Sequence, residues 1–336
     1  MKHPALLYEK KSEQKVICKL CSHRCLIKKD EYGLCNVRKN IQGELYTLVY
    51  GEPVASNLDP IEKKPLYHFM PGTQSYSIAT IGCNFKCPFC QNWQISQGVK
   101  KELIENGNQN ISPEKIVENA VKAGAKSMAY TYTEPTIFFE YAYDISKLAY
   151  KKNIKNVFVT NGYMTDECLE KINPYLDAAN VDIKYFKDES YKKICGARLR
   201  PVLESIKKMK KLGIWIEITT LIIPGENDSH EELKNIAEFI SNLDSNIPWH
   251  ISRFFPQYNY TDKLPTPMET MEKAKTIGIE SGLRYIYLGN VAGGTKTECP
   301  KCGTELIVRR GYSIVKNKIR NGRCPECGKK ISGIWN

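Results

Sequence analysis

The chain has 336 residues, with 49 Lys and Arg against 37 Asp and Glu, so its formal net charge is +12. Apolar residues make up 42% and charged residues 26%, which excludes collagen-like, low-complexity and broadly disordered chains. No apolar run reaches the roughly 18 residues that a membrane span needs, and the first residues lack the hydrophobic region of a signal peptide. We therefore expect a cytoplasmic protein that does not enter the membrane.

The positive charge lies at the two ends of the chain. Residues 1–50 hold ten Lys or Arg and five Asp or Glu, and residues 299–336 hold nine and two. The segment between them has equal numbers of basic and acidic residues and therefore no net charge. An anionic macromolecule would meet the ends first, although an ordinary solvated basic surface explains the same pattern.

Short β-branched and aromatic runs alternate with amphipathic stretches between residues 74 and 290. These runs predict strands at residues 75–80, 128–133, 156–160, 180–184, 214–223, 249–255 and 285–288. Consecutive strand–helix units with apolar strands favour a parallel sheet, curled into a full or partial barrel whose site lies at the carboxyl ends of the strands. An open doubly wound sheet is the alternative, although no G-x-G-x-x-G motif follows the first strand.

Helix signals separate the predicted strands. Ser112 and Pro113 have the residue types of an N-cap and a first helical position, and Ser229 with Glu232 has the pattern of a capping box. Further helices are expected at about residues 135–151, 202–212 and 267–282.

Eleven of the 13 cysteines fall into three groups, which we call the N-terminal, central and C-terminal thiol sets. The N-terminal set is Cys18, Cys21, Cys25 and Cys35, the central set is Cys83, Cys87 and Cys90, and the C-terminal set is Cys299, Cys302, Cys324 and Cys327. Such spacings in a chain without a signal peptide indicate metal or cluster ligands rather than disulfides. The two remaining cysteines, Cys168 and Cys195, are interpreted as ordinary thiols.

The central thiol set lies in the loop expected after the first strand. Its C-x3-C-x2-C spacing would also place three thiols on one face of a helix, but Gly82 and Pro88 oppose a helix here. Three thiolates in a compact loop suit a 4Fe–4S cluster and leave one iron without a protein ligand, which is open for chemistry.

This loop resembles the cysteine loop of the radical SAM superfamily. Residues 59–69 (DPIEKKPLYHF), residues 90–96 (CQNWQIS) and the cysteine-rich ends resemble the AmmeMemoRadiSam-system radical SAM enzymes, which are relatives of pyruvate formate-lyase activating enzyme. The resemblance covers nearly the whole chain. It implies an α/β fold with a partial (β/α)6-type radical SAM barrel, and reductive cleavage of S-adenosylmethionine (SAM) at the cluster to methionine and a 5′-deoxyadenosyl radical.

The resemblance also implies a set of SAM-binding residues at the strand ends. Glu134 matches the acidic residue of a Gly-Gly-Glu-Pro-like motif and would accept hydrogen bonds from the methionine ammonium, although Tyr132 and Thr133 replace the two glycines. Alternatively, Glu134 is a helix N-terminal carboxylate beside Pro135. The other positions that match SAM-contacting groups are Thr160, Asn161, Asp182, Lys184, His250 and Asn290, with Phe89 placed to pack on the adenine.

Several of these positions have a simpler explanation. Lys184 supplies a cation suited to the SAM carboxylate, but a lone strand histidine such as His250 is equally often a satisfied core residue. A plain turn explains Asn290 as well as a contact over the site does. Val159 stands where the activating enzymes carry an aspartate, so an accessory cation site is in doubt.

The two flanking thiol sets predict further metal sites. The C-terminal set forms two Cys-x2-Cys-Gly knuckles separated by 21 residues, which is typical of a zinc ribbon or a rubredoxin-like site, with zinc favoured over iron. The N-terminal set fits zinc, with His23 as an alternate ligand, or an auxiliary iron–sulfur cluster. We therefore divide the chain into a cysteine-rich extension (1–72), the barrel (73–294) and a metal-binding ribbon (295–336).

Three functions fit this sequence. A radical SAM enzyme acting on a macromolecule is favoured, with RNA as the leading substrate, because a basic zinc-binding tail is a common companion of nucleic-acid binding. A glycyl-radical activating enzyme with a protein partner is one alternative, and a non-catalytic metal-knuckle nucleic-acid-binding module is the other. The enzyme would need a reductant such as ferredoxin or flavodoxin, and the family implies AMMECR-like and MEMO-like proteins as partners.

Overall fold

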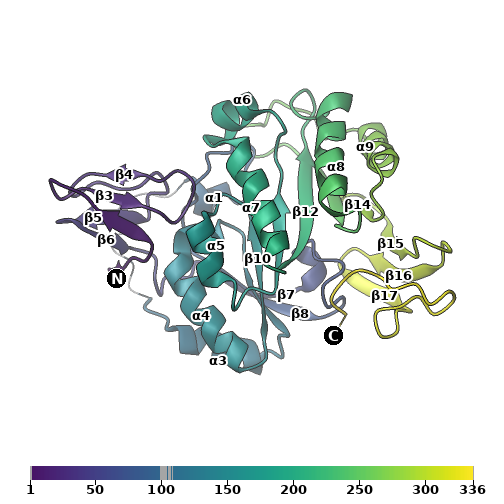
Figure 1. The fold of residues 1–336 in the computed structure, drawn as a ribbon, viewed down its shortest axis with the longest axis horizontal. Helices are drawn as coiled ribbons and strands as arrows, with labels where there is room; N and C mark the ends of the chain where they lie inside the picture. The colour runs from purple at the N-terminus through teal and green to yellow at the C-terminus, as the bar shows by residue number, and fades with distance from the viewer. Residues whose placement is uncertain (1, 99–103, 105–106, 108, 336) are drawn as a thin grey trace.

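The computed structural model describes residues 2–98, 104, 107 and 109–335, and its centre is an eight-stranded sheet (Figure 1). The strand order is β14-β13-β12-β11-β10-β9-β8-β7. The strands from β8 to β14 are parallel to one another, and β7 is antiparallel to β8. Their bounds are β7 (Ala55–Pro60), β8 (Gln74–Ala79), β9 (Ser127–Tyr130), β10 (Lys155–Thr160), β11 (Ala178–Asp182), β12 (Trp215–Ile222), β13 (Trp249–Arg253) and β14 (Ile286–Gly289).

The sheet confirms the parallel α/β fold. Each predicted strand is present, and the order runs from edge β14 to edge β7 without closing, as expected of a partial barrel. Strand β7 was not predicted from the sequence, because Ala-Ser-Asn-Leu-Asp-Pro is rich in residues that are depleted in strands. Its pairing with β8, from Ala55 opposite Ala79 to Pro60 opposite Gln74, determines its conformation.

Helices lie in front of the sheet in Figure 1, which shows α4, α5, α7 and α8 over β10 and β12. Two predicted N-caps are confirmed: the Ser112 side chain accepts a hydrogen bond from the Lys115 N–H, and the Ser229 side chain accepts one from the Glu232 N–H. The Glu232 carboxylate accepts from the Phe186 N–H instead of completing the predicted capping box. The helices are α1 (Trp93–Ser96), α3 (Pro113–Lys122), α4 (Phe139–Lys151), α5 (Asp166–Ile172), α6 (Asp188–Ser190), α7 (Leu199–Lys211), α8 (His230–Asp244) and α9 (Met268–Glu280), with the short helical turns η1 (Ile61–Lys63), η2 (Pro135–Phe138) and η3 (Tyr191–Cys195).

Small antiparallel sheets lie at opposite ends of the long axis of the molecule (Figure 1). The two basic ends of the chain therefore form two separate surfaces. The N-terminal sheets consist of β1 (His3–Pro4), β6 (Glu44–Thr47) and β5 (Arg38–Ile41), and of β2 (Tyr8–Lys10), β3 (Val16–Cys18) and β4 (Leu26–Ile27). The C-terminal sheet consists of β15 (Gly294–Glu298), β16 (Glu305–Arg310) and β17 (Ser313–Asn317).

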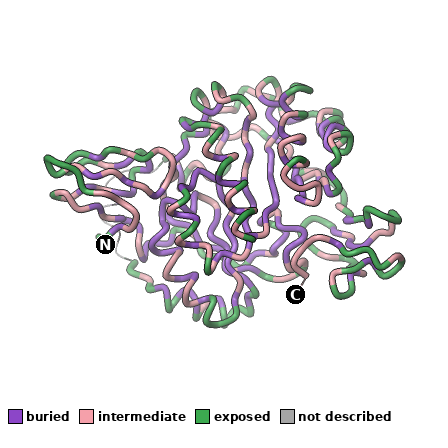
Figure 2. The backbone as a smooth tube through the Cα atoms, viewed as in Figure 1, coloured by how far each residue is buried: buried purple, intermediate pink, exposed green. Residues whose placement is uncertain are grey.

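Buried residues concentrate in the central sheet and its helices (Figure 2). Val16, Leu20 and Val37 of the N-terminal segment belong to the main apolar core, whereas Leu306 and Ile307 of the C-terminal sheet belong to a separate cluster. The predicted boundaries after residues 72 and 294 stay predictions. Within the described part of the chain, no helix has the length and apolar character needed to cross a membrane.

Residues 61–70, which we call the plug segment, pack at the amino end of the sheet. Its Ile61, Leu66 and Phe69 form an apolar cluster with residues of β9, β10 and β11. Its backbone is held by Glu217, the third residue of β12, whose carboxylate accepts hydrogen bonds from the Tyr67 and His68 N–H groups at 3.0 and 2.8 Å. The motif at residues 59–69 thus has a structural role.

Candidate active site at the carboxyl end of the sheet

The central thiol set lies in the loop between β8 and α1. Three parts of the chain hold this loop: the Lys86 N–H donates to the Cys195 carbonyl at 2.9 Å, the Asn259 N–H donates to the Pro88 carbonyl at 2.9 Å, and the Gln97 side chain donates to the Phe85 carbonyl at 2.9 Å. The loop is therefore fixed by segments that follow β8, β11 and β13.

Gly82 brings this loop against the N-terminal segment. Its φ angle is +96°, and a Cβ atom there would lie 2.7 Å from Val37 Cγ1 and 3.1 Å from the Cys35 carbonyl oxygen. A residue with a side chain would be strained in this backbone conformation and would also collide with Val37. The glycine is thus required by the contact between the loop and the segment that carries the N-terminal thiol set.

The central thiols are buried or half-buried and have few protein partners. Cys83 Sγ accepts a hydrogen bond from the Phe85 N–H at 3.4 Å, and Cys90 Sγ lies 3.1 Å from Ser96 Oγ. Burial raises the pKa of the Cys83 and Cys90 thiols, so the apo-protein favours their neutral forms. Thiolates at these positions would need a metal, which deprotonates coordinating thiols.

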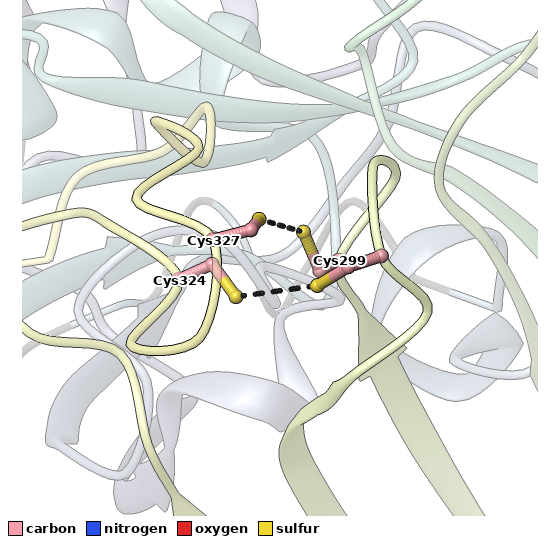
Figure 3. A group of neighbouring side chains, drawn as sticks. Cys299, Cys324 and Cys327 are labelled. Atoms are coloured by element: carbon pink, nitrogen blue, oxygen red, sulfur yellow. Dashed lines mark hydrogen bonds between the residues drawn. The ribbon is translucent and has the colours of Figure 1, made fainter.

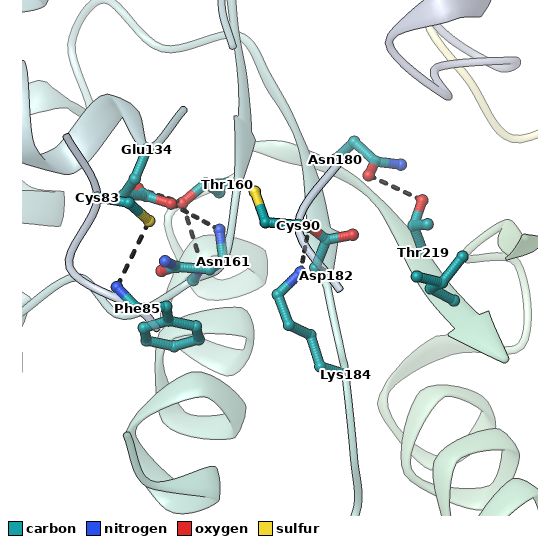
Figure 4. Close-up of polar contacts among 12 residues, drawn as sticks. Cys83, Phe85, Cys90, Glu134, Thr160, Asn161, Asn180, Asp182, Lys184 and Thr219 are labelled. Carbon is teal, nitrogen blue, oxygen red and sulfur yellow. Dashed lines mark hydrogen bonds and ion pairs between the residues drawn. The ribbon is translucent and has the colours of Figure 1, made fainter. Parts of the chain in front are cut away.

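Glu134 lies at the centre of a hydrogen-bond network beside the loop (Figure 4). Its Oε1 accepts from the Thr136 N–H, the Thr136 hydroxyl and the Thr160 hydroxyl at 3.0, 2.5 and 2.7 Å, and its Oε2 accepts from the Asn161 N–H at 2.8 Å. The Asn161 side chain donates to Asn84 Oδ1, inside the loop, at 2.8 Å. The structure therefore brings Glu134, Thr160 and Asn161 together against the cysteine loop.

These bonds confirm one of the two roles considered for Glu134, that of a helix N-terminal carboxylate, while its contact with the methionine ammonium of SAM stays a prediction. It is the N-cap of η2, as the helix alternative predicts, and it joins the ends of β9 and β10. Burial raises the pKa of its carboxyl group, while its four donors oppose that rise. Three of these donors bond to Oε1 and one bonds to Oε2, so a lone pair of Oε2 remains for a further donor such as an ammonium group.

The backbone conformation of Tyr132 is one that favours glycine, the residue that the family motif has at this position. Its φ angle is +64°, in the left-handed region that favours glycine. Its hydroxyl donates to Asp59, and its carbonyl accepts from the Asn92 side chain at 2.8 Å. The turn is therefore kept in this chain with a tyrosine whose contacts hold the less favourable backbone.

Asp182 and Lys184 lie at the end of β11 and form an ion pair, with Lys184 Nζ 3.0 Å from Asp182 Oδ2. Burial opposes the charge of Lys184, but Asp182 and the thiols of Cys87 and Cys195 raise its pKa well above the ordinary value. The Lys184 ammonium lies 6.0 Å from the centre of the Phe89 ring. The predicted cation and the predicted aromatic residue are thus neighbours.

The structure gives His250 and Asn290 other partners. His250 Nε2 lies 2.6 Å from Glu217 Oε2, and its ring meets the Tyr67 ring edge-on, which matches the alternative of a satisfied core histidine. Asn290 is exposed in the turn after β14, and its side chain donates to Ser252 Oγ at 3.0 Å. Neither residue joins the network around Glu134.

Sequence reasoning missed two residues of this site. Cys195, at the end of η3, is buried, and its thiol raises the pKa of the neighbouring Cys87 thiol. No local pattern signalled this contact, because Cys195 lies far along the chain from the central set. Asn84 lies inside the cysteine motif, so its place in the loop was a signal that could have been used.

The C-terminal thiol set has the geometry of a single-ion site (Figure 3). Its four sulfur atoms lie within 4.8 Å of one another, with Cys299 Sγ 3.5 Å from Cys327 Sγ and Cys302 Sγ 3.7 Å from Cys324 Sγ. A tetrahedral zinc ion with Zn–S bonds of about 2.3 Å separates its sulfur ligands by about 3.8 Å. A metal site of this kind at the C-terminal set is therefore confirmed, while the identity of the metal stays a prediction.

The chain was compared with known families, proteins and solved structures. Residues 77–240 match the model of the radical SAM superfamily. An uncharacterised protein of Methanocaldococcus jannaschii is 46% identical over 332 residues, which covers 97% of this chain and 98% of that protein. The chain belongs to the radical SAM superfamily. A putative glycyl-radical enzyme activating enzyme of the same organism is 25% identical and covers 69% of this chain and 85% of its own length.

The fold of this radical SAM protein has solved counterparts. A radical SAM methyltransferase from Sphaerobacter thermophilus superposes with a TM-score of 0.51 at 14% identity, over 66% of this chain and 67% of that one. The chain is a radical SAM enzyme, so the non-catalytic binding module is not its function. The superfamily implies SAM and a 4Fe–4S cluster. The central thiols fit as cluster ligands, because they are buried or half-buried and have few protein partners.

Proposed function

We propose that the central thiol set holds a 4Fe–4S cluster and that the enzyme modifies a macromolecular substrate. When bound together, the cluster and SAM supply a 5′-deoxyadenosyl radical. The observation that carries this proposal is the position of the loop: three buried or half-buried thiols lie beside a buried carboxylate and a lysine at the carboxyl end of a parallel sheet. This is the end of an α/β sheet at which substrates bind.

The chain's own residues would bind and orient SAM. Glu134 supplies a buried negative charge suited to the methionine ammonium, and Lys184 supplies a positive charge suited to its carboxylate. Thr160, Asn161 and Asp182 are proposed to line the same space, because they lie at the ends of β10 and β11. Phe89, next to Lys184, offers an aromatic face for the adenine.

Formation of 5′-deoxyadenosine tests this proposal. Protein purified without oxygen and reduced with dithionite should form 5′-deoxyadenosine from SAM, whereas Cys87→Ala should form none. Cys168→Ala is the matched control, because Cys168 is an equally buried thiol on α5. Equal product from Cys87→Ala and the wild-type protein would contradict the assignment of the central set.

RNA is the substrate that we propose first. The C-terminal sheet and knuckles expose a set of cations, consisting of Lys296, Lys301, Arg310, Lys316, Arg320, Arg323, Lys329 and Lys330. Such a surface suits phosphate contacts, which weaken as salt concentration rises. Because this surface and the cysteine loop lie at different ends of the sheet, a long folded RNA fits better than a short fragment.

Nucleoside mass spectrometry distinguishes RNA from other substrates. Cellular RNA from a strain that lacks the gene should lose one modified nucleoside, and the gene encoding Cys87→Ala should not restore it. An unchanged nucleoside spectrum would exclude RNA. Metal analysis of the same protein should find zinc at the C-terminal set, and one zinc should disappear in Cys299→Ser with Cys324→Ser.

A glycyl-radical activating enzyme is the second candidate. It is favoured by the similarity to a protein named as a putative glycyl-radical enzyme activating enzyme. The substrate would then be a backbone glycine of a partner protein, and a proteomic search for altered peptides in the gene-deleted strain would identify it. A changed peptide together with unchanged RNA would favour this candidate over RNA.

A further inference from the structure

The N-terminal thiol set surrounds a small cavity next to the active-site loop. All four of its cysteines line this cavity, whose volume is about 20 Å³. Half of the other lining residues have apolar side chains, namely Leu20, Ile27, Leu34 and Ile137, and the rest are Gly33, His23, Arg38 and Asn84. The four thiols therefore face one common, dry space, which is the arrangement of a metal centre rather than of scattered core cysteines.

The spread of these thiols differs from that of the C-terminal set. Among the described residues, only the C-terminal set brings three or more cysteine, histidine or carboxylate ligand atoms within 4.8 Å of one another. The N-terminal thiols line one cavity without this convergence, and the central thiols do not converge to this distance either. A single ion draws four sulfurs to about 3.8 Å, whereas a cluster places several irons and sulfides between its thiolates.

The histidine that was considered as a ligand has another partner. His23 Nε2 lies 2.8 Å from the Asn84 carbonyl oxygen, so this nitrogen donates its hydrogen to the active-site loop. The charge of Arg38, which also lines the cavity, is paired with the buried Glu140 at 2.9 Å. Ligation by the other ring nitrogen, Nδ1, is compatible with this bond, but the four cysteines already supply one ligand for each iron of a 4Fe–4S cluster.

We propose that the N-terminal thiol set holds a second 4Fe–4S cluster, ligated by all four cysteines. Because every iron then has a protein ligand, this centre exchanges electrons and does not bind SAM. It shares a wall with the active-site loop, since Asn84 and Ile137 line its cavity and Cys35 touches Gly82. The inference concerns only the N-terminal set, so it does not depend on SAM cleavage.

The full chain with Cys83→Ala, Cys87→Ala and Cys90→Ala tests this proposal, because these changes leave the N-terminal site intact. After anaerobic reconstitution, we expect about four acid-labile sulfides per chain, against about eight in the wild-type protein. Reduction with dithionite should give an S = 1/2 electron paramagnetic resonance signal that added SAM does not change. A sulfide-free triple variant, a second zinc in place of iron, or about two sulfides would each overturn the proposal.

A reciprocal pair of variants separates this result from the active-site assignment. Cys21→Ser with Cys25→Ser should keep about four sulfides and a reduced signal that SAM does change, because only the central cluster remains. Cys299→Ser with Cys324→Ser is the control and should leave the sulfide content of the wild-type protein unchanged. If the triple variant keeps four sulfides while no variant responds to SAM, the proposed function fails and the N-terminal cluster stands.

Discussion

Both ends of the central sheet bury polar and charged groups, but the two ends differ in how many hydrogen-bond partners the protein gives these groups. At the amino end, Glu217 accepts hydrogen bonds from the N–H groups of Tyr67 and His68, from the Trp215 indole and from His250. At the carboxyl end, the buried or half-buried thiols of the central set have few protein partners.

This difference distinguishes groups that stabilise the fold from groups that can take part in the chemistry. Buried polar groups that are fully paired within the protein hold segments together, and the plug segment is held in this way. Thiols without such pairing are free to bind a ligand from outside the protein. The flanking pieces follow the same division, since the N-terminal set touches the cysteine loop, whereas the C-terminal sheet reaches the plug segment through Arg309, which donates to the Tyr67 carbonyl at 2.8 Å.

Removal of Glu217 should break the amino end with little effect on the chemistry. Glu217→Ala leaves four N–H groups without their acceptor, and breaking a buried pair of this kind costs about 3–5 kcal/mol of unfolding free energy. Urea denaturation followed by far-UV circular dichroism measures this loss. Glu204→Ala, which removes an exposed ion pair with Lys207, is the control and should change stability by less than about 0.5 kcal/mol.

A change at Glu134 should have a smaller effect that is confined to the carboxyl end. Glu134→Gln keeps the size of the side chain and removes its charge, so SAM should bind about tenfold more weakly, which corresponds to about 1.4 kcal/mol. Anaerobic isothermal titration calorimetry measures the affinity. Glu167→Gln removes an exposed carboxylate paired with Arg24 and should bind SAM like the wild-type protein. An unchanged affinity in Glu134→Gln would remove this residue from the SAM site.

The protonation of His68 tests the pairing at the amino end with the smallest expected effect. Burial lowers the pKa of His68 from 6.5 to about 4, and its ring bonds to the Ser332 carbonyl and the Tyr287 hydroxyl. Between pH 6.5 and 4 this histidine is protonated in the unfolded chain but neutral in the folded chain, so the free energy of unfolding rises with pH across this window. NMR of protein labelled at histidine nitrogens, with His68→Gln for assignment, should find this ring neutral at pH 5. Titration near pH 6.5 would show that the ring is not desolvated as described.

The sequence predicts those features of the fold that are determined by residues close together in the chain. The parallel strands follow from apolar β-branched runs, and the starts of α3 and α8 follow from Ser112 and Ser229. The superfamily and its cluster loop follow from the spacing of three cysteines. Each of these features depends on residues that lie close together in the chain.

Contacts between distant residues could not be predicted in this way. Glu217 and Tyr67 are 150 residues apart, and His23 and Asn84 are 61 apart, yet these pairs fix the plug segment and the N-terminal site. The same limit explains why His250 was considered for the SAM site and why Cys195 was left out of it. Spacing alone also could not distinguish a single-ion site from a cluster at the N-terminal set, because the distances between its sulfurs depend on the fold.

The most direct test of this division is 5′-deoxyadenosine formation per folded chain in three proteins. Wild-type protein should form 5′-deoxyadenosine from SAM under dithionite, and Cys83→Ala should form none although it folds normally. Glu217→Ala should form it at the wild-type rate per folded chain, at a temperature where it is still folded. Product from Cys83→Ala equal to that of the wild-type protein would contradict the account, as would loss of product in folded Glu217→Ala.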